Sequence, residues 1–307
     1  SRAVKSICDE GRGIGTEIHG EKLGVYLDFS SIIERIGEDK VREKYGNLFD
    51  MYERISGENP YQLPMKIYPA PHYTMGGLWV DYNLMTTIDG LFAAGEANYS
   101  EHGANRLGAS ALMQGLADGY FIAPRTVANY LAKNKLEPIE LDHPDVVKAM
   151  DDVKDRINKL MNAPEPKNSP DYYHKKIGRI LWGACGMSRE KEQLEAAIEE
   201  IKALQIDFWQ HVKVTGIDKD MNQTLERAGR VADFIELGHL MCRDALEREE
   251  SCGCHARMEY LEDDGEAKRD DENFAYVAAW EYSEDGAILN KEQLDFEFVK
   301  PSVRDYT

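Results

Sequence analysis

The stretches "PHYTMGG", residues 71–77, and "EHGANRLGAS", residues 101–110, each set one ionisable side chain among small or flexible residues. Two glycines follow His72 closely, and two more flank Arg106. Because glycine has no Cβ, it lets a backbone pass close to a flat ligand. The two stretches therefore predict a ligand site built around one imidazole and one guanidinium.

The chemistry of these two side chains favours a small dicarboxylate. The planar guanidinium of Arg106 can bind one carboxylate through two bonds, and His72 can donate a hydrogen bond to the other. A helix that starts near Gly108 would direct free N–H groups and its positive dipole end at a bound anion, including a flavin ring that gains negative charge on reduction. The alternative from spacing alone is that His72 is an ordinary hydrogen-bonded turn residue.

Length and composition exclude some classes of protein. The chain has 307 residues, of which 42% are apolar and 30% charged, a globular composition with room for two domains. The net charge of -19 repels phosphate backbones, so we expect no nucleic-acid partner. No apolar stretch approaches the roughly 20 residues that span a bilayer, so we expect no direct membrane insertion.

The cysteines indicate a reducing compartment. There are five, an odd number, and most lie far apart in the sequence, which does not suit a disulfide framework. The segment "CGCH", residues 252–255, looks like half of a zinc site, but such a site needs about four ligands and no second Cys/His pair of suitable spacing follows. We expect no metal, and a tight glycine turn at this segment.

Four regions differ in texture and together predict an α+β fold. Residues 1–66 contain a strand signal in "GVYLDFSSI" and a surface helix in "GEDKVREKYGNLFDMYERI". Residues 67–125 predict two short strands with a turn at Asp89–Gly90, then a helix rich in small residues. Residues 126–248 are strongly helical, and residues 249–307 turn to strands.

The helical region predicts a bundle, because its apolar residues recur at steps of three and four and so form one stripe per helix. One stripe contains Leu194, Ala197, Ile198, Ile201 and Leu204, and another contains Leu225, Ala228, Ala232 and Ile235. In the tail, "FAYVAAWEYSEDGAILN" predicts a hairpin that turns at Asp285–Gly286, and "DFEFV", residues 295–299, predicts a further half-buried strand.

Several motifs together resemble one known family. "HYTMGG", "GLFAAGEA" and "HGANRLG", in this order and spacing, resemble the flavoprotein subunit of succinate dehydrogenase and fumarate reductase. In the tail, "ESCGCHAR" is similar to that family's E-S-R-G-x-H-x-R stretch, with Cys252 in place of an arginine, and "RDDENF", residues 269–274, is similar to R-D-D-x-x-W/F. The resemblance covers nearly the whole chain, and the ordered combination is specific where each motif alone is not.

The resemblance implies roles for five residues. His72 matches the family's substrate-binding histidine, and Arg106 matches the arginine that holds a substrate carboxylate. Glu96 matches the residue that bonds the ribose of FAD. Ala111 and Leu112 stand where the family has a Ser-Leu pair beside the flavin, so the hydroxyl is missing here while the backbone N–H remains.

The resemblance also implies a domain plan. Residues 1–66 would be the end of a mobile capping domain, 67–125 the C-terminal part of an FAD-binding α/β domain, 126–248 a helical domain and 249–307 a β-rich tail. Family members begin with a βαβ unit that carries the FAD pyrophosphate, and the family's proton-delivering arginine would fall just before Ser1. We therefore expect this chain to be the C-terminal half of the subunit and to be inactive alone.

The implied reaction is the interconversion of succinate and fumarate by hydride transfer with FAD. The implied partners are an iron–sulfur subunit and a membrane anchor subunit, which would hold the protein peripherally on the cytoplasmic side of the inner membrane. L-aspartate oxidase is an alternative, because its family has similar segments. That family lacks the long acidic tail, so the tail of this chain favours the first interpretation. A non-catalytic helical docking module is another, and it predicts that His72 and Arg106 lie far apart.

Overall fold

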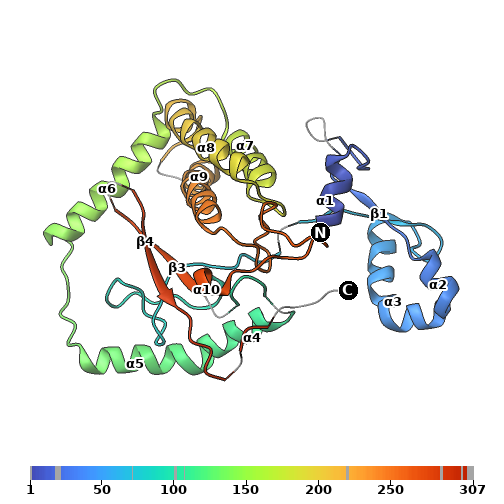
Figure 1. Ribbon diagram of the computed structural model, residues 1–307. Coiled ribbons are helices and arrows are strands. Elements are labelled where there is room, and N and C mark those ends of the chain that lie inside the picture. The colour runs from blue at the N-terminus through green and yellow to red at the C-terminus, as the bar shows by residue number, and fades with distance from the viewer. Residues whose placement is uncertain are drawn as a thin grey trace. The chain divides into compact units, whose positions relative to one another are not determined.

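The computed structural model describes residues 2–17, 22–70, 72–99, 102–106, 108–218, 221–283, 286–298 and 300–302. The chain divides into two compact units, Ser1–Tyr73 and Thr74–Thr307. Among the described residues, each unit combines helices with one small antiparallel sheet, so the fold is α+β as predicted (Figure 1). No helix in this described part is both long enough and apolar enough to cross a membrane.

The first unit packs helices around aromatic side chains. Its elements are α1 (Arg2–Asp9), β1 (Val25–Leu27), α2 (Ser30–Ile36), α3 (Glu38–Ser56) and β2 (Met65–Ile67), with β1 and β2 antiparallel. The ring of Phe49 on α3 is 1% exposed and meets Phe29 and Tyr61 edge-on at 4.9 and 4.7 Å between centroids. The predicted strand and surface helix of this region are confirmed.

The second unit begins with loops in place of the two predicted strands. Gly90 has a left-handed φ of 79°, so the predicted turn at Asp89–Gly90 is confirmed, but Met85 and Phe92 form only an isolated bridge. The strand prediction was wrong because the carboxylate of Asp81 accepts the backbone N–H groups of Asn83 and Met85, at 2.8 and 3.0 Å. Such side-chain bonds compete with a strand ladder and fold the segment into a turn.

Short helical elements follow these loops. They are η1 (Gly95–Ala97), α4 (Ser110–Ala117), the π-helical turn η2 (Asp118–Ile122) and α5 (Ala123–Lys133). The helix predicted to start near Gly108 therefore begins at Ser110.

The predicted helical bundle is confirmed. Its helices are α6 (Pro144–Met161), α7 (Pro170–Ala184), α8 (Lys191–His211) and α9 (Gln223–Glu247). Helices α7, α8 and α9 lie side by side and share one core (Figure 1). The α8 stripe faces that core, with Leu194 0%, Ile201 1% and Leu204 2% exposed.

The tail contains α10 (Asp271–Phe274) and a hairpin of β3 (Tyr276–Glu281) and β4 (Ile288–Gln293). The hairpin was predicted, although its predicted turn residue Asp285 lies outside the described residues. The strand predicted at 295–299 was wrong for 295–298, and Val299 also lies outside the description. Gln293 pairs with Tyr276, the first residue of β3, so residues beyond Gln293 have no strand left to pair with in that sheet.

The "CGCH" segment forms the predicted tight turn, here called the tail turn (residues 252–255). Cys252 and His255 exchange backbone hydrogen bonds of 2.8 and 3.0 Å, and Gly253 has a left-handed φ of 57°. Nδ1 of His255 lies 2.6 Å from the guanidinium of Arg189, and Nε2 lies 3.0 Å from the carbonyl oxygen of Arg248. Since a guanidinium only donates, Nδ1 accepts and the ring proton sits on Nε2.

Arg257 fixes the tail turn to the end of α9. Its side chain is buried, and its guanidinium donates to the carbonyl oxygens of Ala245 and Leu246 at 3.0 and 3.1 Å. These carbonyls have no partner inside the helix, and a cation at a helix C-terminus is also favoured by the dipole. The hydroxyl of Ser251 bonds both the N–H and the carbonyl oxygen of Arg257.

Replacing Ile201 by Ala should lower the free energy of unfolding by about 2 to 5 kcal/mol, because it leaves a cavity in the bundle core. Ile206 lies on the same helix but is 74% exposed, so Ile206→Ala is a matched control that should change stability by less than about 0.5 kcal/mol. Urea unfolding followed by circular dichroism measures both. Equal losses in the two variants would contradict this packing.

His255 should make stability depend on pH. Burial and then the charge of Arg189 lower the pKa of His255 to about 4, below the usual value near 6.5 of an unfolded chain. The unfolded chain therefore takes up the proton more readily, and the stability present above about pH 6.5 is lost as pH falls toward 4. Between about pH 7.5 and 4.5 the loss from this group should be on the order of 2 to 3 kcal/mol.

His255→Gln supplies the control for this pH effect, because glutamine keeps one donor and one acceptor but does not titrate. Urea unfolding at both pH values should show a smaller acid-induced loss in the variant than in the wild type. An identical loss would mean that His255 does not stay neutral in the folded chain.

Candidate active site

Glu96 lies on η1 and reaches the segment that follows His72. Its Oε1 accepts the backbone N–H of Thr74 at 2.9 Å. Within the part of the chain that the structure describes, Oε2 of Glu96 meets no hydrogen-bond donor. One oxygen therefore fixes the carboxylate to the "HYTMGG" segment, and the Glu96 residue as a whole is exposed.

Arg106 is joined to the same segment from the other side. Its backbone N–H donates to the sulfur of Met75 at 3.1 Å. Thr74 and Met75, adjacent in the chain, thus contact Glu96 and Arg106 respectively. The segments "HYTMGG", "GLFAAGEA" and "HGANRLG" therefore meet at Thr74 and Met75.

Gly77 makes this meeting possible. A Cβ at this position would lie 2.6 Å from the carbonyl oxygens of both Ala97 and Asn98, which no real side chain tolerates. The next residue, Leu78, donates its N–H to Ala97 at 2.9 Å and accepts from the N–H of Tyr99 at 3.0 Å. The sequence predicted that Gly77 lets the backbone approach a flat ligand, whereas here the close approach is to another segment of the protein.

A buried polar cluster holds η1 against α4. The carboxylate of Asp118 is buried and accepts from the N–H of Gly95 at 2.8 Å and from the side-chain amides of Asn98 and Gln114 at 3.2 and 3.4 Å. A buried carboxylate is stable only when donors surround it in this way. Sequence reasoning missed this cluster; the available signal was Gln114 and Asp118, four residues apart on one helix face inside an apolar segment.

Ala111 and Leu112 lie in the first turn of α4, which contacts η1. Ala109, just before the helix, has a left-handed φ of 65° and turns the chain into it. The N–H groups of a first helical turn have no acceptor within the helix, so they can meet an anionic or electron-rich ligand. Asp118 therefore holds η1, which carries Glu96, against α4, which carries Ala111 and Leu112.

His72 is exposed and belongs to the first unit, which ends one residue later at Tyr73. Arg106 belongs to the second unit. Their convergence on one ligand therefore stays a prediction, supported by the contacts of Thr74 and Met75, the second and third residues after His72.

The tail turn contacts the loop that carries Arg106. The N–H of Cys254 donates to the carbonyl oxygen of Ala104 at 2.8 Å, and its thiol lies 3.8 Å from the side-chain oxygen of Asn105. A Cβ on Gly253 would lie 2.4 Å from that same carbonyl oxygen of Ala104. The sequence predicted the turn, but not that it packs on a segment almost 150 residues earlier.

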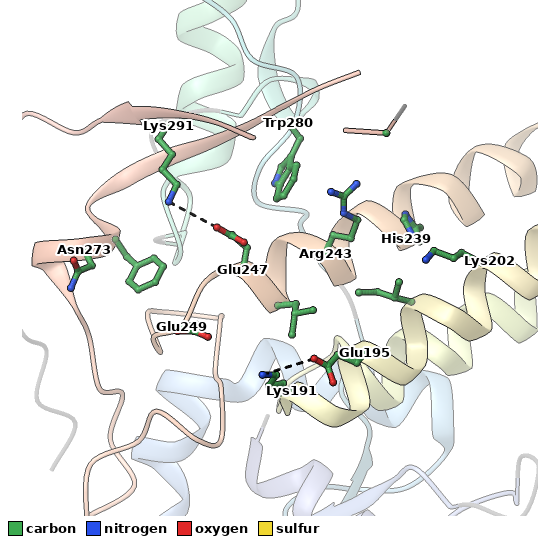
Figure 2. Close-up of a pocket in the computed structure, with 14 residues that line it drawn as sticks. Lys191, Glu195, Lys202, His239, Arg243, Glu247, Glu249, Asn273, Trp280 and Lys291 are labelled. Atoms are coloured by element: carbon green, nitrogen blue, oxygen red, sulfur yellow. Dashed lines mark ion pairs between the residues drawn. The ribbon is translucent and has the colours of Figure 1, made fainter. Parts of the chain in front are cut away.

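A separate cavity of about 950 Å³ lies between α8, α9 and the tail hairpin (Figure 2). Its charged lining combines cations and anions, namely Lys191, Lys202, Arg243, Lys291, Glu195, Glu247 and Glu249. Because these charges nearly cancel, and because none of the five predicted site residues lines it, this cavity is not the candidate active site. Over the described ranges, no cluster of three or more His, Cys, Asp or Glu side chains could hold a metal ion.

Comparison with known proteins agrees with the fold and the motifs. Residues 174–306 match the family model described as fumarate reductase flavoprotein C-term, and residues 7–112 match the one described as FAD binding domain. The N-terminal match therefore covers both Glu96 and Arg106 and ends at Leu112.

Similar proteins are about twice as long as this chain. The chain is 30% identical over 295 residues to the succinate dehydrogenase flavoprotein subunit of Bacillus subtilis, covering 94% of this chain and 47% of the relative. It is 29% identical over 264 residues to the fumarate reductase flavoprotein subunit of Haemophilus influenzae, covering 86% and 41%. A solved quinol–fumarate reductase with menaquinol molecules has a TM-score of 0.78 at 26% identity, covering 98% of this chain and 50% of that one.

The alternative enzyme is a weaker match. The chain is 26% identical over 259 residues to the L-aspartate oxidase of a Synechocystis species, covering 80% of this chain and 43% of the relative. The tail and bundle, by contrast, match the fumarate reductase flavoprotein model over most of their length. Over nearly its whole length the chain is therefore similar to about half the length of the flavoprotein subunits of succinate dehydrogenase and fumarate reductase.

Proposed function

We propose that the complete protein interconverts succinate and fumarate with FAD as its cofactor. The observation that supports this most is the meeting at Thr74 and Met75, where the segment after His72 contacts both Glu96 and Arg106. A flavin site and a dicarboxylate site must be adjacent for hydride transfer, and these contacts bring their predicted residues onto one short segment.

Arg106 and His72 bind the substrate. The guanidinium of Arg106 holds one carboxylate through paired hydrogen bonds, and the imidazole of His72 donates to the other end of the diacid. The two side chains thereby orient the carbon–carbon bond that is oxidised or reduced.

The residues present fit FAD. The second oxygen of Glu96 would accept hydrogen bonds from the ribose hydroxyls of FAD, and the first-turn N–H groups at Ala111 and Leu112 would contact its flavin. Ala111 provides no hydroxyl, so this contact is made by backbone alone. FAD, when bound, supplies the hydride acceptor or donor for the two-electron step.

Large apolar side chains are exposed beside these residues. Leu112, Met113, Tyr120 and Phe121 of α4 and η2 are 71%, 68%, 75% and 72% exposed. Large exposed apolar side chains that gather in one part of a chain are typical of an interface. We assign it to the flavin and to the remainder of the FAD-binding domain, of which residues 67–125 are the C-terminal part, with residues 1–66 as the end of the capping domain.

The partners follow from the chemistry of electron transfer. Electrons that enter or leave a flavin deep in one subunit need a relay to a quinone, and an iron–sulfur subunit supplies it. In this proposal residues 126–248 are the helical domain of the subunit and residues 249–307 are its tail. A membrane anchor subunit then holds the complex on the cytoplasmic side of the inner membrane.

The complete protein, reconstituted with FAD, should turn over succinate with an artificial electron acceptor and reduce fumarate with an artificial donor. L-aspartate should not be oxidised. The assay is a direct spectrophotometric comparison of the two substrates at equal concentration. Turnover of aspartate without turnover of succinate would assign the protein to the aspartate oxidases instead.

In the complete protein, Arg106→Ala should lower kcat/KM for succinate. The fall should correspond to a loss of about 3 kcal/mol or more of transition-state stabilisation. The kcat/KM of Arg106→Lys should lie between the values of the wild type and Arg106→Ala, because lysine keeps the charge but loses the planar fork. Arg125→Ala is the control, since Arg125 is exposed on α5. If kcat/KM fell as much in Arg125→Ala as in Arg106→Ala, the result would contradict the assignment of Arg106 to the substrate carboxylate.

A further inference from the structure

We propose that the tail turn, residues 252–255, positions Arg106 for its carboxylate by holding the backbone of Ala104 and Asn105. This inference rests on the proposed role of Arg106 and adds a function for the C-terminal tail. It makes Gly253 and His255 positioning residues that touch neither substrate nor flavin.

The contact itself leaves little freedom. The N–H of Cys254 donates to the carbonyl oxygen of Ala104 at 2.8 Å, and Gly253 approaches so closely that a Cβ would lie 2.4 Å from that oxygen. Gly253 also has a left-handed φ of 57°. Glycine is therefore required both for the turn and for the approach.

The loop is held from a second side as well. Two residues after Ala104, the N–H of Arg106 donates to the sulfur of Met75. A displacement of the Ala104 carbonyl rotates the following peptide planes, and with them the direction of the Arg106 side chain. The tail turn and Met75 together therefore fix the backbone position from which the Arg106 side chain extends.

If the contact is crowded, the loop yields before the turn does. The ring of His255 is buried and bonded through both nitrogens, to Arg189 and to the carbonyl oxygen of Arg248. Gly103 and Asn105, which flank Ala104 in the loop that bears Arg106, are by contrast exposed. A buried, fully bonded group is costly to displace, and an exposed loop is not.

The test compares Gly253→Ala with Gly265→Ala in the complete protein with FAD bound. Both glycines have a left-handed φ, 57° and 85°, so both substitutions introduce backbone strain. A Cβ on Gly265 meets nothing within 4 Å, whereas one on Gly253 strikes Ala104. Comparing the two variants therefore distinguishes a steric clash with the Arg106 loop from a general loss of stability.

The readout is the Kd of malonate, a diacid without the carbon–carbon bond that succinate loses hydrogen from, measured by the change in flavin absorbance. Gly253→Ala should raise this Kd by at least about tenfold, and Gly265→Ala should leave it within about twofold of the wild type. The ratio of FAD to protein should be the same in all three, because Glu96 and α4 are untouched. An unchanged Kd in Gly253→Ala would overturn the inference.

A second pair of variants keeps the test decisive if Gly253→Ala fails to fold. His255→Ala should raise the Kd of malonate, and His255→Gln, which keeps a donor and an acceptor, should restore most of it. A Kd that stays at the wild-type value in His255→Ala would count against positioning. A wild-type protein that does not bind malonate at all would contradict the proposed function itself, so the two failures differ.

Discussion

The close approach of Gly253 to the carbonyl oxygen of Ala104 connects parts of the second unit that the sequence keeps far apart. One side of this contact is the loop with Arg106, and the other is a turn anchored to the end of α9 by Arg257. Because the bundle core is closely packed, the end of α9 is a firm support. The end of α9 therefore supports the Arg106 loop through the tail turn.

Although the chain is strongly acidic overall, several of its charged side chains pair with neighbouring groups of the protein. The guanidinium of Arg257 is occupied by carbonyl oxygens at the end of α9, and that of Arg248 by carbonyl oxygens of the tail and by the buried Glu250 at 2.8 Å. The buried carboxylate of Asp118 is likewise satisfied by neighbouring donors. Each of the charges named here is therefore paired within the protein.

The sequence predicted those features that depend on local pattern. The stripe through Leu194 and Ile201 gave the bundle, and the glycine of "CGCH" gave the tail turn. The strands near Met85 failed because one carboxylate, that of Asp81, captures the backbone. The bond from Thr74 to Glu96 and the contact between Gly253 and Ala104 join segments with no shared periodicity, so no spacing in the chain could have predicted them.

The most direct test of the central claim is an experimental structure of the complete protein with FAD and fumarate. The account predicts that one carboxylate of fumarate lies within hydrogen-bond distance of the Arg106 guanidinium, the other lies at the His72 imidazole, and the flavin lies alongside the Ala111–Leu112 turn. Fumarate bound elsewhere, or His72 and Arg106 separated by more than the length of a four-carbon diacid, would contradict it.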